Sequence, residues 1–119
     1  MDQRLTTSSP TLDQRVFRVV EVSPNSAISS ETLFRFVETD AWVAADYAGG
    51  CIACGRLVGR RLSDDKLTVG YAQVHTDGIV RTGTSEWQIN LDRDGRVRLV
   101  ESYKWDDGTT GENILEAAS

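Results

Sequence analysis

Closely spaced turn signals constrain this chain more than any other feature of its sequence. They are short groups of residues, each of which contains Asp, Asn or Gly: Pro24-Asn25, Thr39-Asp40, Ala48-Gly49-Gly50, Ser63-Asp64-Asp65, Asp77-Gly78, Asp94-Gly95 and Asp107-Gly108. Gly, Asn and Asp tolerate the positive φ that tight hairpin turns require. Seven such turns separate eight segments of the chain.

The segments between the turns are rich in Val, Ile, Thr, Phe, Tyr and Trp, which is typical of β-strands. We predict strands at roughly residues 14–22, 31–38, 41–48, 51–61, 66–75, 79–91, 96–105 and 111–116. Two places compete with this interpretation: residues 26–30 suit a helical turn, and the C-terminal ENILEAAS suits either a helix or a strand with a frayed end. We favour the strand.

Short hairpin connections make neighbouring strands antiparallel, so eight consecutive strands form an up-and-down meander. An open sheet of this size would leave two exposed edges, and closure into a barrel removes them. The sequence therefore predicts an all-β fold, an eight-stranded antiparallel up-and-down β-barrel of the avidin-like or calycin-like kind, with a two-sheet sandwich as the alternative. The interior of such a barrel is filled by side chains or holds one small ligand.

Alternation along the strands predicts which side chains face the interior. Val97, Leu99, Glu101, Tyr103 and Trp105 share one face, and so do Leu67, Val69, Tyr71, Gln73 and His75. The segments 14–22 and 51–61 are apolar on both faces, which suggests that their outer face is covered by a second subunit. The candidate ligand-binding residues are the inward aromatic and polar ones: Tyr47, Tyr71, Gln73, Ser85, Trp87, Glu101, Tyr103 and Trp105.

The length and net charge of the chain limit the number of domains and the kinds of partner it can have. A chain of 119 residues is one domain's worth, and we expect a flexible tail over residues 1–13 and a barrel domain over 14–119. Thirteen basic and 18 acidic residues give a net charge of −5, which argues against binding to nucleic acid or to an anionic membrane. No apolar run is long enough to span a membrane, so we expect a cytoplasmic protein.

The sequence offers little chemistry for catalysis. Cys51 and Cys54 are three residues apart on a predicted strand, where their Cα atoms would lie roughly 10 Å apart, beyond the reach of a disulfide. We expect free thiols, no metal site and no cofactor, and we expect His75 to be solvated or to cap a strand. Glu101 lacks an obvious partner for acid–base work, so we expect no enzyme.

Four blocks of sequence point to a family: YAGGCIACGRLVG from Tyr47, YAQVHTDG from Tyr71, DGRVRLVESYKW from Asp94 and DGTTGENILE from Asp107. Together they resemble a group of small bacterial proteins described as avidin-like, over roughly residues 15–117. The resemblance implies an eight-stranded avidin-like barrel. Members often carry the label acetylglutamate synthase. Enzymes with that activity are similar to α/β proteins with a Gly-rich phosphate loop, and this chain has no such loop.

The resemblance does not extend to biotin binding. In true avidins a Gly-x-Trp and an Asn near the first strand open the biotin site, whereas this chain reads RVFRVVEV there. Two functions remain. The first is a non-enzymatic barrel that binds a small, partly apolar ligand at its mouth. The alternative is a structural or interaction module whose barrel is filled by side chains and which forms a homodimer through its outer strand faces.

Overall fold

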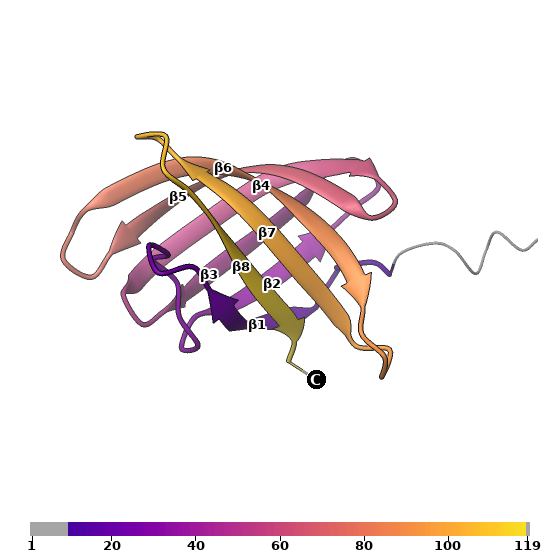
Figure 1. Cartoon of the computed structure of the whole chain (residues 1–119). Helices are drawn as coiled ribbons and strands as arrows, with labels where there is room; N and C mark the ends of the chain where they lie inside the picture. Colours follow the sequence, from indigo (N-terminus) through magenta and orange to yellow (C-terminus); the bar gives the residue numbers. More distant parts are fainter. Residues whose placement is uncertain (1–9, 119) are drawn as a thin grey trace, which may run out of the picture.

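The computed structural model describes residues 10–118, and within them the chain forms eight strands (Figure 1). They are β1 (Val16–Val22), β2 (Leu33–Glu38), β3 (Val43–Gly49), β4 (Ile52–Ser63), β5 (Lys66–His75), β6 (Val80–Leu91), β7 (Val97–Trp105) and β8 (Thr110–Ala117). The C-terminal segment is therefore a strand, as favoured. Residues 26–30 form irregular loop instead of the helical turn that was considered.

The strands close into a barrel in sequence order, which confirms the predicted fold over the sandwich. Every neighbouring pair is antiparallel, and β1 also pairs with β8, with Phe17 opposite Ala117. In Figure 1 the sheet wraps round on itself until the last strand lies beside the first. Closure leaves no strand of the barrel with an unpaired edge.

Glycines make the hairpins possible at several of the predicted turns. Gly78, Gly95 and Gly108 have φ of 91°, 79° and 90°, and each follows an aspartate. A side chain at these positions would strain the backbone, because L-residues rarely adopt positive φ. Gly49 and Gly50 adopt the same region between β3 and β4. The Asp-Gly pattern thus explains three of the tight connections.

Side chains alternate between the interior and the surface as the sequence predicts. Val97, Leu99, Glu101, Tyr103 and Trp105 of β7 are all buried. In the two strands that are apolar on both faces, the structure shows which face points inward. In β1, Phe17 and Val19 point inward while Val20 and Val22 are exposed, and in β4, Leu57 is buried while Val58 is 63% exposed.

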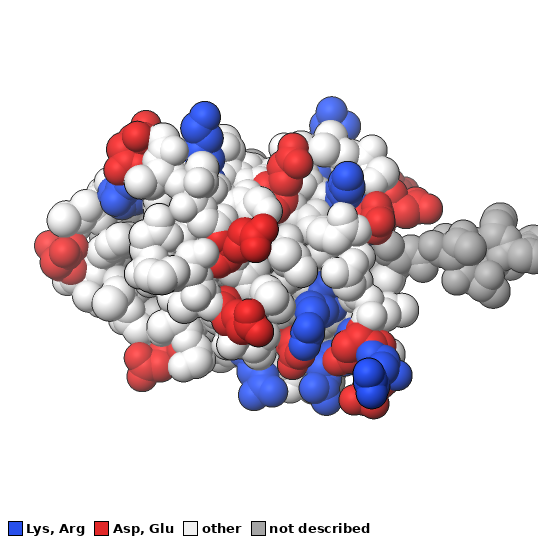
Figure 2. All heavy atoms as spheres, in the orientation of Figure 1, with Lys and Arg blue, Asp and Glu red and all other residues white. Residues whose placement is uncertain are grey.

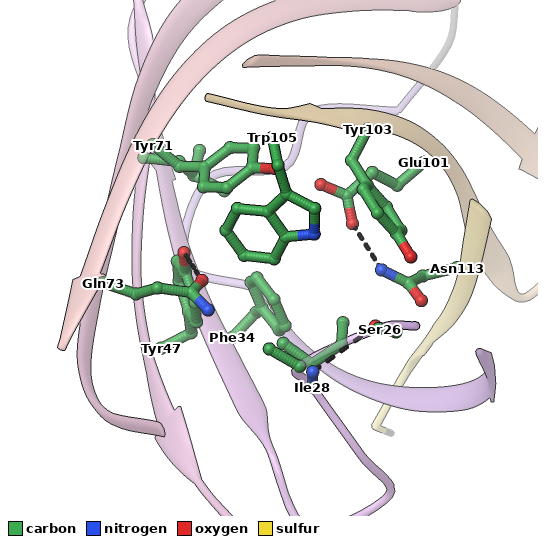
Figure 3. A pocket seen from close by; sticks show the side chains of 12 residues that line it. Ser26, Ile28, Phe34, Tyr47, Tyr71, Gln73, Glu101, Tyr103, Trp105 and Asn113 are labelled. Atoms are coloured by element: carbon green, nitrogen blue, oxygen red, sulfur yellow. Dashed lines mark hydrogen bonds between the residues drawn. The ribbon is translucent and has the colours of Figure 1, made fainter. Parts of the chain in front are cut away.

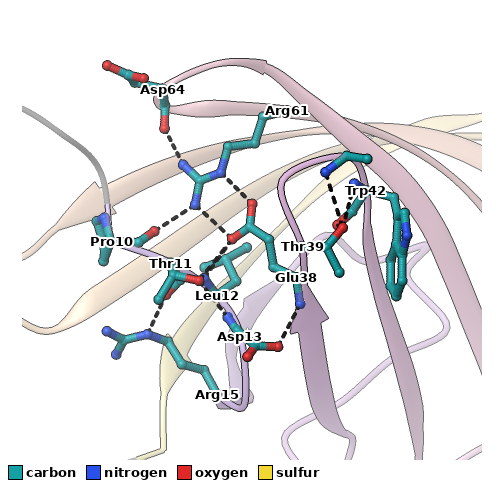
Figure 4. Close-up of polar contacts among 11 residues, drawn as sticks. Pro10, Thr11, Leu12, Asp13, Arg15, Glu38, Thr39, Trp42, Arg61 and Asp64 are labelled. Carbon is teal, nitrogen blue, oxygen red and sulfur yellow. Dashed lines mark hydrogen bonds and ion pairs between the residues drawn. The ribbon is translucent and has the colours of Figure 1, made fainter.

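The residues just before β1 contact Glu38 at the end of β2 and Arg61 near the end of β4 (Figure 4), and we call Pro10, Leu12, Glu38 and Arg61 the clasp at this end of the barrel. Leu12 is fully buried there, and its backbone N–H donates to Glu38 Oε1 over 2.8 Å. Arg61 donates from Nε to Glu38 Oε2 over 2.6 Å and from Nη2 to the Pro10 carbonyl over 2.6 Å. The ion pair between Arg61 and Glu38 thereby helps to hold the apolar Leu12 side chain in this end of the barrel.

The clasp bears on the tail expected over residues 1–13. Residues 1–9 lie outside the described part of the chain. Residues 10–13 differ from the expectation, because they lie against the barrel and contribute Leu12 to its core. A single Leu between Thr11 and Asp13 carries no periodic signal, so the sequence pattern did not reveal it.

Charge on the surface is mixed. On the face drawn in Figure 2, acidic and basic side chains are interspersed among neutral ones. Arg98 and Arg96 both pair with Glu116, the first over 2.5 Å and the second over 3.7 Å. The described residues contain no helix capable of crossing a membrane.

Candidate functional site

A pocket occupies the end of the barrel opposite the clasp, where β3, β5 and β7 finish (Figure 3). We call this end the barrel mouth. The pocket is lined by Ser26, Ala27, Ile28, Phe34, Tyr47, Leu57, Tyr71, Gln73, Glu101, Tyr103, Trp105 and Asn113. Aromatic and aliphatic side chains make up most of its walls, with a few polar groups among them, which is the usual composition of a small-molecule site.

Three tyrosines of the pocket each lie over a glycine on the neighbouring strand. Tyr47 is opposite Gly55, Tyr71 is opposite Gly83 and Tyr103 is opposite Gly111 in the strand register. A Cβ atom at each of these glycines would collide with the tyrosine ring or its hydroxyl. The glycines therefore leave the room in which the rings lie flat against the barrel wall.

The aromatic rings also contact one another. The Phe34 and Tyr47 rings stack with centroids 4.4 Å apart. Trp105 meets Tyr71 edge to face at 5.4 Å and Tyr103 at 5.9 Å. These contacts bring the aromatic side chains of four strands together around one space (Figure 3), and edge-to-face pairs hold such rings in defined orientations.

Glu101 is the one carboxylate among the described lining residues, and it is 6% exposed. Asn113 Nδ2 donates a hydrogen bond to its Oε1 over 2.9 Å. No Lys, Arg or His within residues 10–118 forms an ion pair with it. Burial raises the pKa of Glu101 from 4.5 to about 7, and hydrogen bonds from Asn113 and Ser85 oppose that rise.

Two buried polar atoms of the pocket lack a hydrogen-bond partner among the described residues: the Tyr71 hydroxyl and Asn113 Oδ1. Both residues are buried, Tyr71 with 9% and Asn113 with 3% of its surface exposed. Native proteins satisfy most buried polar groups, and leaving one unpaired costs roughly 1–3 kcal/mol. Two such atoms beside a buried carboxylate mark a place where a polar ligand would gain hydrogen bonds.

A second polar chain runs along the opposite wall of the pocket. The Tyr47 hydroxyl donates to Gln73 Oε1 over 2.7 Å, and Gln73 Nε2 lies 2.8 Å from His75 Nε2. Burial raises the pKa of Tyr47, so its hydroxyl stays neutral. These groups satisfy one another and fix the amide orientation.

The segment between β1 and β2, residues 23–32, covers the barrel mouth, and we call it the cover loop. Its first end is attached to β7 and β8, since the Tyr103 hydroxyl donates to Asn25 Oδ1 over 2.5 Å and Asn25 Nδ2 donates to the Thr110 carbonyl. Its second end is attached through the Thr32 hydroxyl, which donates to the Gly49 carbonyl over 3.0 Å. Between these attachments, Ala27 and Ile28 lie over the pocket through apolar contacts.

The covered pocket is small. The cavity between its side chains has a volume of about 20 Å³. A volume of roughly 10–15 Å³ on that scale is enough for one water molecule. The pocket as it stands therefore admits a group about the size of a water molecule.

The match of the sequence to a family model decides the family. A model of the family described as "Avidin-like protein" matches residues 10–118, which is nearly the whole chain. The chain belongs to the avidin-like protein family. Searches of curated proteins and of solved structures gave no match.

The avidin-like barrel brings together most of the residues that the sequence analysis singled out. Tyr47, Tyr71, Gln73, Glu101, Tyr103 and Trp105 all line the pocket. Trp87 faces inward but lies outside the lining, because its ring packs edge to face on Phe34 and Phe36 towards the closed end. Its Nε1 donates to Ser85 Oγ over 2.8 Å, so Ser85 links the Trp87 ring to the Glu101 carboxylate and supports the pocket from below.

Several lining residues of the avidin-like barrel were missed from the sequence. Asn113 alternates with Leu115 on β8, and both are buried, so period-two patterning on that strand was a usable signal. Ser26, Ala27 and Ile28 lie in an irregular loop, where no periodicity indicates which side chain faces inward. Phe34 alternates with Phe36 on β2, so period-two patterning places both inward, but nothing in the sequence distinguishes the mouth end from the closed end.

Cys51 and Cys54 are free, as predicted, and both are exposed. His75 is half-buried at the end of β5 and contacts Gln73, so it takes part in the polar chain of the pocket wall instead of standing in solvent. Among the described residues, no three His, Cys, Asp or Glu side chains are grouped in a way that could hold a metal ion.

Proposed function

We propose that this avidin-like protein binds a small molecule at the barrel mouth and does not transform it. The observation that carries this proposal is the pair of buried, unpartnered polar atoms, Tyr71 Oη and Asn113 Oδ1, next to the Glu101 carboxylate in an aromatic pocket. A ligand that supplied their missing hydrogen bonds would recover most of the cost of their burial. The surrounding rings would supply apolar contact area.

Binding of anything larger than a water-sized group requires the centre of the cover loop to move. The loop is suited to this, because hydrogen bonds to the barrel hold its two ends at Asn25 and Thr32, whereas Ala27 and Ile28 contact the pocket through apolar side chains. Displacing Ile28 would expose Phe34 and Trp105 to an apolar part of the ligand. A ligand with a polar head and an apolar body fits this arrangement.

The same set of groups argues for binding rather than catalysis. Glu101 is the only ionisable carboxylate in the described lining, and the tyrosines beside it are held neutral by burial, which raises the pKa of Tyr47 and Tyr71. A general acid–base reaction needs a second group that positions or activates the substrate. Besides Glu101, the described lining offers aromatic rings and amide groups. These groups suit recognition of a ligand better than activation of a substrate.

A fragment screen by ligand-observed NMR tests the proposal. Wild type is compared with Tyr71→Phe, which deletes only the unpartnered hydroxyl, and with Trp42→Ala, which removes a 49% exposed tryptophan on the outside. Fragments that bind the pocket lose affinity by about fivefold or more in the first variant and keep it in the second. Fragments that bind all three proteins equally, or the lack of any binder, would overturn the proposal.

The alternative of a homodimer rests on a separate observation. Val37, Ala44, Val58 and Gly70 occupy one outward row across β2 to β5, and Val58 and Val37 are both exposed. An uncharged row of small side chains on a sheet face is a candidate for pairing with a second copy. Light scattering on wild type, Val58→Lys and the exposed control Ser102→Lys decides it. A dimer that only Val58→Lys dissociates supports this function, and a monomeric wild type rejects it.

A further inference from the structure

We propose that the ligand presents a primary ammonium group to Glu101, which would make the barrel mouth a binding site for small amines. This inference rests on the proposed function, because it names the chemical class of the ligand for the same pocket. It goes further in assigning charge, hydrogen-bonding pattern and size to the part of the ligand that reaches Glu101. Each of these three properties follows from a different observation.

The charge follows from the groups that face Glu101. They come from every side of the pocket and are uncharged: Asn113 from β8, Ser85 from β6, Tyr71 from β5, Tyr47 from β3 and Tyr103 from β7. A cation lies beside the pocket, since the Arg81 guanidinium is 4.6 Å from the centre of the Trp105 ring. This guanidinium pairs with Asp106 and Asp107 instead of Glu101. A buried carboxylate without a counter-ion favours a cation over a neutral or anionic ligand.

The hydrogen-bonding pattern follows from what the free atoms can do. Asn113 Oδ1 and the carboxylate oxygens only accept hydrogen bonds, and Asn113 Nδ2 is already used on Glu101. The Tyr71 hydroxyl, which has no partner, can also accept. An ammonium group has three N–H donors and no acceptor, so it matches a site in which the free polar atoms can accept.

The walls favour the same charge. Trp105, Tyr71 and Tyr103 surround the space beside Glu101, with their rings set edge to face against one another (Figure 3). Aromatic faces attract cations, by about 0.5–2 kcal/mol depending on how far the cation is desolvated. A carboxylate or phosphate head would meet the Glu101 charge without any basic group in the described lining to offset it.

The size follows from the volume. A cavity of about 20 Å³ fits an ammonium group, which is close to a water molecule in size. A guanidinium or a trimethylammonium group is too large for that space. The rest of the ligand would extend towards Phe34 and Ile28, the apolar side chains at the cover loop.

A titration monitored by the Trp indole N–H signals tests the inference with four probes of similar length: butylamine, 1-butanol, pentanoate and butyltrimethylammonium. Wild type is compared with Glu101→Gln, which keeps an oxygen for the Asn113 amide and removes the charge. We expect wild type to bind butylamine about tenfold or more tightly than the other three probes. We expect Glu101→Gln to lose that preference, so that it binds butylamine and 1-butanol about equally.

The pH profile gives a second readout. Because burial raises the pKa of Glu101 to about 7, the affinity of wild type for butylamine should rise from about pH 6 to about pH 8, and that of Glu101→Gln should stay flat. His75 contacts Gln73 and is present in both proteins, so its ionisation cancels in the comparison. Arg81, Asp106 and Asp107 are also present in both proteins, so their contributions to the pH profile cancel in the same way.

The outcomes separate this inference from the function on which it rests. Equal binding of butylamine and 1-butanol, or an amine preference that survives in Glu101→Gln, would overturn the ammonium assignment. If no probe binds, the assignment also fails, and the fragment screen then shows whether the pocket binds other molecules. A fragment that loses affinity in Tyr71→Phe would keep the binding function while the amine class is rejected.

Discussion

Asn113 on β8 donates a hydrogen bond to Glu101 on β7 inside the barrel, and the two residues are directly opposite in the strand register. The contact satisfies one oxygen of a carboxylate that is almost completely buried. It leaves the other polar atom of Asn113 unpartnered and the negative charge without a counter-ion within the described residues. Glu101 therefore lowers the stability of the barrel, which supports the proposal that it serves ligand binding.

The first prediction concerns stability against pH. The pKa of Glu101 is raised from 4.5 to about 7 by burial, so the folded state holds this proton more tightly than the unfolded state does. The free energy of unfolding should therefore fall as pH rises from about 4.5 to about 7, by roughly 3 kcal/mol from this group. Urea unfolding of wild type and Glu101→Gln across this range measures it. A difference between the two proteins that does not change with pH would contradict the account.

The second prediction separates two tyrosines of the pocket. The Tyr71 hydroxyl has no partner, whereas the Tyr47 hydroxyl donates to Gln73 over 2.7 Å. Tyr71→Phe should leave the free energy of unfolding unchanged or raise it, and Tyr47→Phe should lower it by about 1–2 kcal/mol, because it leaves the Gln73 oxygen unpaired. Thermal and urea unfolding of both variants check this. A loss of stability in Tyr71→Phe equal to that in Tyr47→Phe would mean that Tyr71 is a structural hydrogen-bonding group.

The third prediction concerns the clasp at the closed end. Arg61→Ala removes the hydrogen bonds to Glu38 and to the Pro10 carbonyl, so it should destabilise the protein by about 1–3 kcal/mol. It should also speed amide hydrogen exchange at Leu12, whose N–H donates to Glu38. The neighbouring exposed Arg60→Ala is the matched control and should change neither quantity. Equal effects of the two variants would show that the clasp adds nothing specific.

The clasp also predicts how the stability of the protein changes at acidic pH. Burial alone would raise the pKa of Glu38, but hydrogen bonds from Arg61 and Leu12 outweigh it and hold the pKa below its usual value. The stabilisation from Glu38 is thus complete above its unfolded pKa and is lost as pH falls through the folded pKa. Wild type should lose more stability than Arg61→Ala on acidification below about pH 4.5, because that variant lacks the main opposing group.

The fourth prediction tests the pairing of tyrosines with glycines. A Cβ at Gly83 would meet the Lys104 carbonyl and the Tyr71 hydroxyl, whereas a Cβ at Gly70 has only the Gly83 carbonyl at 4.0 Å. Gly83→Ala should therefore lower the free energy of unfolding by about 1–3 kcal/mol and shift the Tyr71 ring signals. Gly70→Ala should be neutral or slightly stabilising. Similar effects of both substitutions would contradict the proposed role of Gly83.

The barrel itself could be predicted from the sequence because its signals are local. Asp77-Gly78, Asp94-Gly95 and Asp107-Gly108 supply the positive φ of three turns, and alternation over Val97 to Trp105 gives the inward face of β7. Six of the eight candidate residues line the pocket, since an inward side chain near the end of a strand reaches it. Trp87 fails this rule because its long side chain points towards Phe36 and the closed end.

What could not be predicted depends on contacts between distant segments. Leu12 is buried because Arg61 and Glu38 hold it, and those residues are 49 and 26 positions away. The cover loop lies over the mouth because Asn25 bonds to Thr110, which is 85 residues later. The volume of the pocket depends on where Ile28 packs, and no pattern in a loop of small and polar residues specifies that.

The most direct test of the account is an ¹H–¹⁵N spectrum recorded with the strongest binder from the fragment screen. The three tryptophans report on three places: Trp105 lines the pocket, Trp87 lies in the core below it and Trp42 is exposed outside. The account predicts that the Trp105 indole N–H, the Asn113 side-chain amide and the backbone amides of the cover loop shift together while Trp42 stays unchanged. Shifts centred on Trp42 or on the outer face around Val58, with Trp105 unmoved, would contradict it.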